Sequence, residues 1–296
     1  MTALSFVNFY LIPGIVLGCV VALGALGLTL LFGILRFAHF AHGDVMTFGA
    51  YAAFVVVASF GVSPYAALPV AMAAAIALAL LVDRLFYRPL RRSSPVVLLI
   101  SGFGVALMVR AVIYMGFGPD SIAYESGIRR PIVLAGLRIQ ERHIAIIVLT
   151  LTLALATHLF LARTRTGKAM RAMADNPDLA RICGIAVERV IAWTWVIGGA
   201  LAAAAGVFLA IDTQLMPLMG ANLLLSMFAA VILGGIGRPI GAIVGGLIIG
   251  IAEELAAAPL FGTAGLVQPA YKVGVAFAAM VLMLILRPTG LFRGQA

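Results

Sequence analysis

Long apolar runs repeat along almost the whole chain and are separated by short polar connections. A membrane-spanning helix needs about 20 mainly apolar residues. The runs lie at roughly 11–35, 44–60, 65–87, 94–115, 143–162, 190–211, 220–236, 240–258 and 270–287. Because their apolar positions are continuous and do not alternate with polar ones, they predict helices and exclude a membrane β-barrel. We therefore expect an all-α, polytopic membrane bundle of about eight or nine spans that forms a single domain, 1–296.

The composition agrees with this pattern, since 64% of the residues are hydrophobic and only 10% are charged. The 20 basic residues exceed the 11 acidic ones, which gives a net charge of +9. In a soluble protein such an excess would suggest a nucleic-acid partner. In a membrane protein the same excess marks the cytoplasmic loops, so we expect contact with membrane lipid and no nucleic-acid partner.

The basic residues are unevenly distributed, and this predicts the orientation of the chain. The first 35 residues contain no Lys or Arg, so we expect the first span to be retained with its N-terminus outside. Basic residues cluster at 84–92, at 163–189 and in the tail after residue 286. Placing these three segments inside gives an N-out, C-in topology. Alternation then places segment 116–142 outside, where glycine, proline and acidic residues accompany its arginines.

Two segments, Phe32 to Tyr51 and Leu233 to Gly250, each join two apolar runs through a short polar turn that contains glycine. Interrupted spans in both halves of a transporter point to its pathway, but two ordinary tight hairpins would give the same pattern. We therefore expect some broken or re-entrant spans. The candidate pathway residues are His42, Gly43, Asp44, Asn222 and Ser226. Asn222 and Ser226 are chosen by placement alone, and helix packing explains them equally well.

The motif "HFAHGD" places His39, His42 and Asp44 within six residues, so a metal site is an alternative to a bend at the membrane edge. No second cluster of ligands accompanies it in the sequence, and we expect no metal. The remaining acids of interest, Asp212, Glu253 and Glu254, lie near the ends of apolar runs, where we expect them at the membrane interface. A carrier coupled to protons or sodium needs buried acids or the backbone oxygens of an unwound helix. In this prediction no acid falls at mid-membrane, which argues against such a carrier.

The chain also lacks a Walker A motif and a Gly-x-Ser-x-Gly nucleophile turn. We therefore expect that it is not an enzyme and binds no cofactor. Any ATP that drives it would have to be bound and hydrolysed by a partner chain.

The stretch "RTRTGKAMRAMADNPDLARICGIAVERV", Arg163 to Val190, carries six basic and three acidic residues between two apolar runs. Within it, "DNPDLARICG" reads as a short helix. Asp175 or Asn176 can cap its start, Pro177 fits its first position and Gly184 its end. Leu179 and Ile182 share one face, while Asp178 and Arg181 share another. Such a helix can rest on anionic lipid or form a plain structured loop, but its apolar face is narrow and favours docking on a protein.

Several stretches resemble one family. "TRTGKAMRAMADNPDLARICGI" resembles the cytoplasmic loop of branched-chain amino-acid ABC transporter permeases, specifically the LivH-like subunit. "RFAHFAHGDVMTFGAY", "AAVILGGIGRPIGAIVGGLIIG" and "LRPTGLFRG" are similar to three further signatures of that family, so that the likeness spans about residues 10–294. The chain departs from the family at Arg36, where a polar residue such as Asn is common, and in its doubled "FAHFAH".

The resemblance implies an inner-membrane permease subunit of a bacterial importer for branched-chain or related amino acids. Relatives of the family move urea, amides or other small polar solutes, and a self-contained secondary transporter or channel is the alternative class. The implied partners are a LivM-like second permease, two ATPase subunits and a periplasmic binding protein. The implied coupling loop is 163–189, and the residues that would contact the ATPase are Asp175, Asn176, Pro177, Asp178, Leu179, Ala180, Arg181, Gly184 and Ile185.

Overall fold

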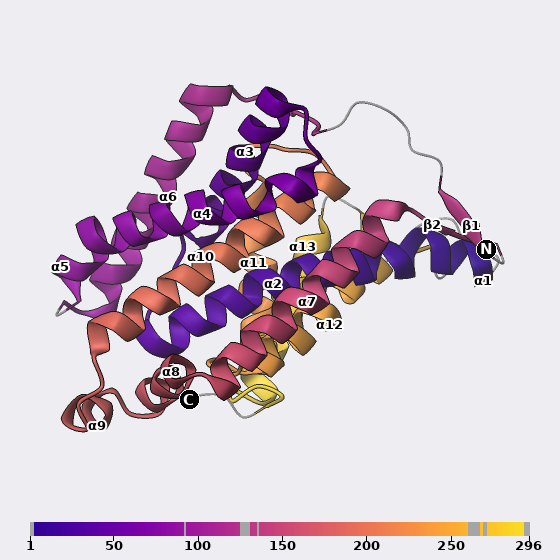
Figure 1. Ribbon diagram of the computed structural model, residues 1–296. Coiled ribbons are helices and arrows are strands. Elements are labelled where there is room, and N and C mark those ends of the chain that lie inside the picture. Colours follow the sequence, from indigo (N-terminus) through magenta and orange to yellow (C-terminus); the bar gives the residue numbers. More distant parts are fainter. Residues whose placement is uncertain are drawn as a thin grey trace.

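The computed structural model describes residues 3–91, 93–124, 131–134, 136–259, 267–268 and 271–292. Helices form in all of the predicted apolar runs, with ends that differ from the prediction by a few residues (Figure 1). They are α2 (Ile12–Leu35), α3 (His42–Phe60), α4 (Pro64–Val82), α6 (Pro95–Phe117), α7 (Glu141–Arg163), α10 (Val187–Asp212), α11 (Met219–Gly234), α12 (Pro239–Ala256) and α13 (Lys272–Leu286).

Shorter elements extend or connect these helices. Before α2 lie α1 (Ala3–Phe6) and the π-helical turn η1 (Val7–Leu11), and α4 continues into η2 (Asp83–Tyr87) and α5 (Arg88–Leu90). Strands β1 (Ile132–Leu134) and β2 (Leu137–Ile139) pair as an antiparallel hairpin. Between α7 and α10 the chain forms α8 (Arg165–Asp175) and α9 (Pro177–Ile182).

Among the described residues, seven helical stretches are long and apolar enough to cross a membrane, while α11 and α13 are shorter apolar helices. This confirms the all-α, polytopic membrane fold. The number of spans and the orientation stay predictions.

Helices α2 and α10 form the centre of the bundle, because most of their residues are buried within the chain. They pack against each other, and α10 also packs on α3 and α4 while α2 packs on α12. In contrast, only about a third of the residues of α6 and α7 are buried and both helices expose many apolar side chains, as expected for helices at the periphery of a membrane bundle.

Glycine allows α2 and α12 to pack with their backbones in contact. A Cβ atom on Gly250 would collide with the backbone of Gly18. Small residues of this kind let helices approach closely in a bilayer, where van der Waals packing drives association. Gly14 and Gly18 of α2 and Gly246 and Gly250 of α12 all lie at this contact within the chain.

The start of α3 lies beside the middle of α2. His42 Nε2 lies 3.0 Å from the Gly24 carbonyl oxygen, and Gly24 is about 16 Å from the end of α2 at Leu35, at 1.5 Å per residue. Arg36 adopts a left-handed conformation (φ 56°) that turns the chain at this point. Residues 36–41 therefore fold back into the bundle, as a re-entrant segment within Phe32 to Tyr51 requires.

The second interrupted segment, Leu233 to Gly250, is different. Helices α11 and α12 meet directly after the turn at residues 235–238, and a Cβ atom on Gly234 would collide with the Gly241 backbone. This segment is an ordinary tight hairpin, which is the alternative that the sequence left open.

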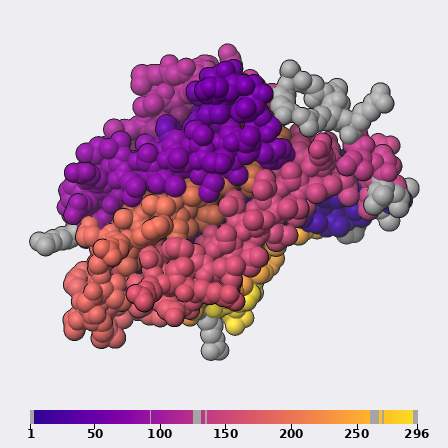
Figure 2. Space-filling model, viewed as in Figure 1, coloured from indigo at the N-terminus to yellow at the C-terminus, as the bar shows by residue number. Residues whose placement is uncertain are grey.

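The N-terminus and the β-hairpin lie at one end of the bundle, and α8 and α9 lie at the opposite end, where they protrude at the lower left (Figures 1 and 2). Asn8 Nδ2 donates to the Gly136 carbonyl (3.1 Å), and the Arg138 backbone N–H donates to Asn8 Oδ1 (3.0 Å). The hairpin in segment 116–142 is thus on the same side as the N-terminus, as the predicted topology requires.

Candidate functional site

Helix α8 lies against the end of the bundle through one apolar face. Thr164 caps its start, where the hydroxyl accepts from the Gly167 N–H at 2.9 Å. Met170 and Met173, three residues apart, are buried against the bundle, whereas Lys168 and Arg171 are exposed. The helix is therefore amphipathic and is held by its apolar side, while its basic side chains stay exposed.

Helix α9 begins and ends at the residues that the sequence predicted. Of the two predicted capping residues, Asn176 is the one used: its Oδ1 accepts from the N–H groups of Asp178 (3.1 Å) and Leu179 (3.0 Å). At the other end Gly184 is left-handed (φ 80°), and Ile185 N donates to the Ala180 carbonyl oxygen at 3.1 Å. This is a Schellman motif, so both ends of this six-residue helix are satisfied by its own chain.

The outer face of α9 is apolar and exposed. Leu179 is 57% exposed and Ile182 is 83% exposed, while Ala180 is buried against the bundle. Asp178 and Arg181 approach to 3.8 Å on the surface, and such an exposed pair contributes little stability. The structure thus presents two large apolar side chains on a rigid helix at the tip of the molecule.

Two salt bridges, from Arg88 (3.4 Å) and Arg91 (2.7 Å) to Glu188, join the end of the α4–α5 helix to the start of α10, beside α9. Arg91 binds both carboxylate oxygens of Asp83 (2.8 and 2.6 Å) and Glu188 Oε1 (2.7 Å). Burial on its own lowers the pKa of Arg91, but Asp83 and Glu188 outweigh it and raise the pKa above its ordinary value. A cavity of about 1160 Å³, which Pro177 and Arg181 also line, lies between this network and α9.

The re-entrant segment brings the predicted residues His42, Gly43 and Asp44 together inside the chain. His42 Nε2 bonds the Gly24 carbonyl, which fixes the tautomer with the proton on Nε2. Gly43 packs on the backbone of Gly220 at the start of α11. The start of α3 is therefore held by two neighbouring helices through backbone contacts.

Asp44 forms a buried ion pair with Arg110 of α6. Arg110 Nε lies 2.9 Å from Asp44 Oδ1, and its second nitrogen lies 3.2 Å from Oδ2. The Asp44 side chain is 1% exposed, and that of Arg110 is 25% exposed. This geometry satisfies both carboxylate oxygens, as a buried charge requires.

Ser226 does not face open space but donates a hydrogen bond of 2.5 Å to Glu253 Oε1. Both residues are buried, and Glu253 is 3% exposed. Glu253 is therefore buried within the bundle, because α12 turns this side chain towards the middle of α11, and its placement at the membrane interface stays a prediction. Glu254, one residue further, pairs with Lys272 at 2.7 Å.

Asn222 is the one candidate pathway residue that is exposed, whereas His42, Gly43, Asp44 and Ser226 are buried. Nearby, Phe40 from the re-entrant segment contacts Phe103 of α6 and Phe228 of α11, with ring centroids 6.3 and 5.2 Å apart. Within the described ranges, no group of three His, Cys, Asp or Glu residues could hold a metal ion. His39, the other histidine of the motif, bonds the Tyr87 hydroxyl at 3.0 Å.

Sequence reasoning missed the contacts of two charged residues within the bundle, the partly buried Arg110 and the buried Glu253. Arg110 lies inside a predicted span, and a charged residue in a span is by default a candidate for function, so this signal was present in the sequence. Glu253 gave no comparable signal, because it lies close to the end of its apolar run, where an interfacial position is expected.

The chain is similar to known proteins over nearly its whole length. Residues 10–284 match the family described as branched-chain amino acid transport system / permease component. The chain is 33% identical to "High-affinity branched-chain amino acid transport system permease protein BraD" of Pseudomonas aeruginosa, over 95% of this chain and 94% of that protein. It is 34% identical to the permease protein LivH of Escherichia coli K12, over 94% and 92%. A probable LivH of Methanocaldococcus jannaschii is 33% identical over 90% and 86%.

Among solved structures, PsaBC from Streptococcus pneumoniae in complex with Fab covers 96% of this chain and 95% of its own. The TM-score is 0.53 at 12% identity, which shows a shared fold and nothing further. The family match and the three relatives instead rest on the sequence itself, along nine-tenths of the chain or more. The chain therefore belongs to the family of branched-chain amino acid transport system permease components and is a permease subunit of an ABC importer.

Proposed function

We propose that this permease subunit imports branched-chain or related small amino acids, and that α9 receives the movement of an ATPase subunit. The observation that carries the docking role is the exposed pair Leu179 and Ile182 on a helix whose two ends are capped. Two neighbouring apolar side chains on a rigid helix suit a groove on a partner protein. The relatives BraD and LivH, which are named for branched-chain amino acid transport, support the substrate class.

The contacts of α8 and α9 offer a route for this movement into the bundle. Residues 183–186 join α9 directly to α10, one of the two central helices. Helix α8 packs on α7, α10 and α2, and its buried residues Met170 and Met173 fix that position. A displacement of α9 would therefore move α10, because the connection is too short and too well hydrogen-bonded to absorb it.

In this proposal the chain works with a LivM-like second permease, two ABC ATPase subunits and a periplasmic binding protein in a bacterial inner membrane. The partner subunits bind and hydrolyse ATP, and this chain contributes no cofactor. The end with α8 and α9 faces the cytoplasm, and the end with the β-hairpin faces outside. Support for this orientation is the excess of Lys and Arg around α8 and α9.

We place the translocation pathway along the face where Phe40 bridges α6 and α11, next to Asn222. This face combines the exposed ring of Phe103 and the half-buried rings of Phe40 and Phe228 with a polar amide, which suits a solute that has an apolar side chain and charged main-chain groups. His42, Gly43, Asp44 and Ser226 would then hold the lining helices from behind, since they are buried.

The docking step is tested by the double variant Leu179→Asp/Ile182→Asp, co-expressed with the partner subunits. We expect loss of the ATPase subunits on purification and loss of ATP-driven leucine uptake in proteoliposomes that hold the binding protein. Ile132→Asp/Val133→Asp is the matched control, because these two side chains are equally exposed apolar residues at the other end. Normal recovery of the ATPases with the α9 variant would refute the docking role. Uptake by the purified chain alone would instead indicate a secondary transporter.

A further inference from the structure

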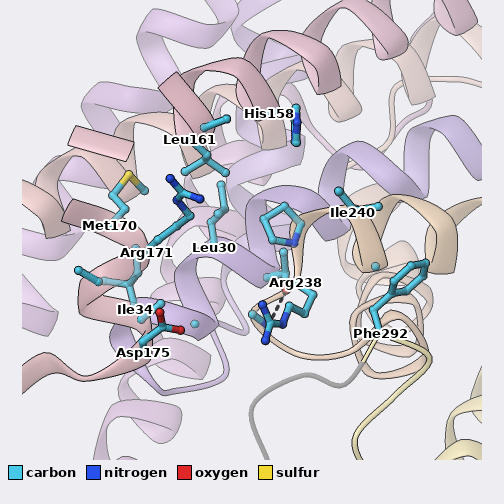
Figure 3. A pocket seen from close by; sticks show the side chains of 18 of the residues that line it. Leu30, Ile34, His158, Leu161, Met170, Arg171, Asp175, Arg238, Ile240 and Phe292 are labelled. Carbon is cyan, nitrogen blue, oxygen red and sulfur yellow. Dashed lines mark hydrogen bonds between the residues drawn. The ribbon is translucent and has the colours of Figure 1, made fainter. Parts of the chain in front are cut away.

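A cavity of about 730 Å³ opens where α2, α7, α8 and α12 come together at the α8–α9 end (Figure 3). Its volume lies in the range of roughly 300–1,000 Å³ that is usual for small-molecule sites. One part of its wall is apolar, formed by Leu30 and Ile34 of α2, Leu161 of α7 and Ile240 of α12. The cavity can therefore hold a hydrocarbon group.

The rest of the wall is basic. Lys168 and Arg171, three residues apart on α8, line the cavity from one side, and Arg238 lines it from the start of α12. Figure 3 shows Arg171 on the α8 side and Arg238 on the α12 side. Over the described part of the chain neither Lys168 nor Arg171 forms a salt bridge, and the one carboxylate in the lining is that of Asp175. Three cations against one acid favour an anionic occupant.

The surroundings of the cavity are those of the membrane surface. Helices α7 and α12 both pack on α2, and beyond the cavity each exposes apolar residues that are suited to lipid. Leu151, Leu155 and Leu159 follow each other at four-residue steps on α7, and Ile240 and Ile248 lie eight residues apart on α12. The basic residues lie where these apolar helices end, which is the level of lipid headgroups.

We propose that this cavity binds one anionic phospholipid. Its phosphate lies between Lys168, Arg171 and Arg238, and its acyl chain follows the apolar wall at Leu161 and Ile240. Basic pockets between helices on the cytoplasmic side bind anionic headgroups in this way. The choice of the cytoplasmic leaflet rests on the orientation in the proposed function. A bound lipid would join α8 to α12, so the position of the coupling segment would depend on the lipid.

The test compares retention of dioleoylphosphatidylglycerol with that of dioleoylphosphatidylcholine by the full chain in detergent, measured by native mass spectrometry. We expect selective retention of the anionic lipid. The variant Lys168→Gln/Arg171→Gln should weaken binding of the anionic lipid about 25-fold, because the loss of each cation should weaken it about fivefold. Arg163→Gln/Arg165→Gln is the control, because these arginines belong to the same segment but do not line the cavity. The control should change retention by less than about twofold.

Two further measurements identify the occupant. Inorganic phosphate and glycerol 3-phosphate should compete poorly, and Ile240→Gln, which alters an exposed part of the apolar wall, should weaken lipid retention as well. Strong binding of inorganic phosphate without lipid selectivity would overturn the proposal in favour of a soluble anion. Loss of the ATPase subunits from Lys168→Gln/Arg171→Gln with unchanged lipid retention would overturn it in favour of an acidic partner surface.

The lipid proposal and the docking role fail separately. Leu179→Asp/Ile182→Asp should retain the lipid, because these side chains point away from the cavity and do not line it. Lipid retention is measured on the chain without its partners, so a failure of ATPase docking leaves this result unaffected.

Discussion

The buried ion pair between Asp44 and Arg110 predicts an unequal response to the loss of each partner. Arg110→Met removes the cation that pairs with the Asp44 carboxylate, a side chain that is 1% exposed. Asp44→Asn leaves Arg110 without its carboxylate partner. The Arg110 side chain is 25% exposed, long and flexible, so it can turn towards water or headgroups. The arginine substitution should therefore be the more damaging of the two.

The expected sizes follow from the geometry. Removing the partner of a fully buried charge costs about 3–5 kcal/mol, so Arg110→Met should lower the free energy of unfolding by that amount. Asp44→Asn removes a charge-assisted hydrogen bond and should cost about 1.5–3 kcal/mol. The double variant carries no buried charge at this site, and we expect it to be more stable than Arg110→Met alone by about 2 kcal/mol.

Thermal unfolding of the purified chain in detergent measures this difference. At about 2 °C for each kcal/mol in a chain of this size, Arg110→Met should lower the melting temperature by about 6–10 °C. Arg84→Met is the matched control, because Arg84 is an exposed arginine on η2, and it should shift the melting temperature by about 1 °C or less. If the double variant is no more stable than Arg110→Met, the ion pair is not what stabilises the start of α3.

Four further outcomes are expected. Ser226→Ala should destabilise the chain by about 1–3 kcal/mol in the same thermal assay, because it leaves the buried Glu253 carboxylate without its donor, and Glu253→Gln in the same chain should restore part of the loss. Gly250→Leu should lower the melting temperature and the yield of monodisperse protein by forcing α2 and α12 apart, whereas Gly274→Leu on α13, with open space around it, should not. Gly184→Ala should cost about 1 kcal/mol through its left-handed conformation and should weaken ATPase recovery, while Gly104→Ala, a helical glycine in open space, should leave recovery unchanged. Cys183 is exposed and Cys19 is buried. In whole cells a membrane-permeant maleimide should therefore label each chain once, at Cys183, and an impermeant maleimide should not label it. Labelling by the impermeant reagent would place Cys183 outside and reverse the predicted orientation.

The helices were predictable because the bilayer leaves the backbone few alternatives. Each apolar run has to satisfy its own backbone hydrogen bonds, so the run at 190–211 becomes a helix regardless of its neighbours, and α10 differs from it by a few residues. Local chemistry was equally informative at α9, where Pro177 and Gly184 act within their own turns. The choice of Asn176 over Asp175 as the cap depends on where α8 ends, and sequence alone left it open.

The partners of the buried charges were not predictable, because they come from helices far apart in the sequence. Asp44 and Arg110 are 66 residues apart, and Ser226 and Glu253 are 27 apart. A hydropathy pattern states that a residue lies in a span but not which side of the helix meets which neighbour. Glu253 was placed at the interface for this reason.

The start of α3 is where these contacts combine. His42 binds α2, Gly43 packs on α11, and Asp44 binds α6, all within three consecutive residues. One turn later Met46 meets α10, where a Cβ atom on Gly206 would collide with the Met46 carbonyl. If α9 receives a push as proposed, the resulting shift of α10 would reach α3 directly, since tightly packed backbones cannot be compressed. Because the Asp44–Arg110 pair ties α3 to α6, we expect α3, α6 and α10 to move together, which would change the face where Phe40 bridges α6 and α11.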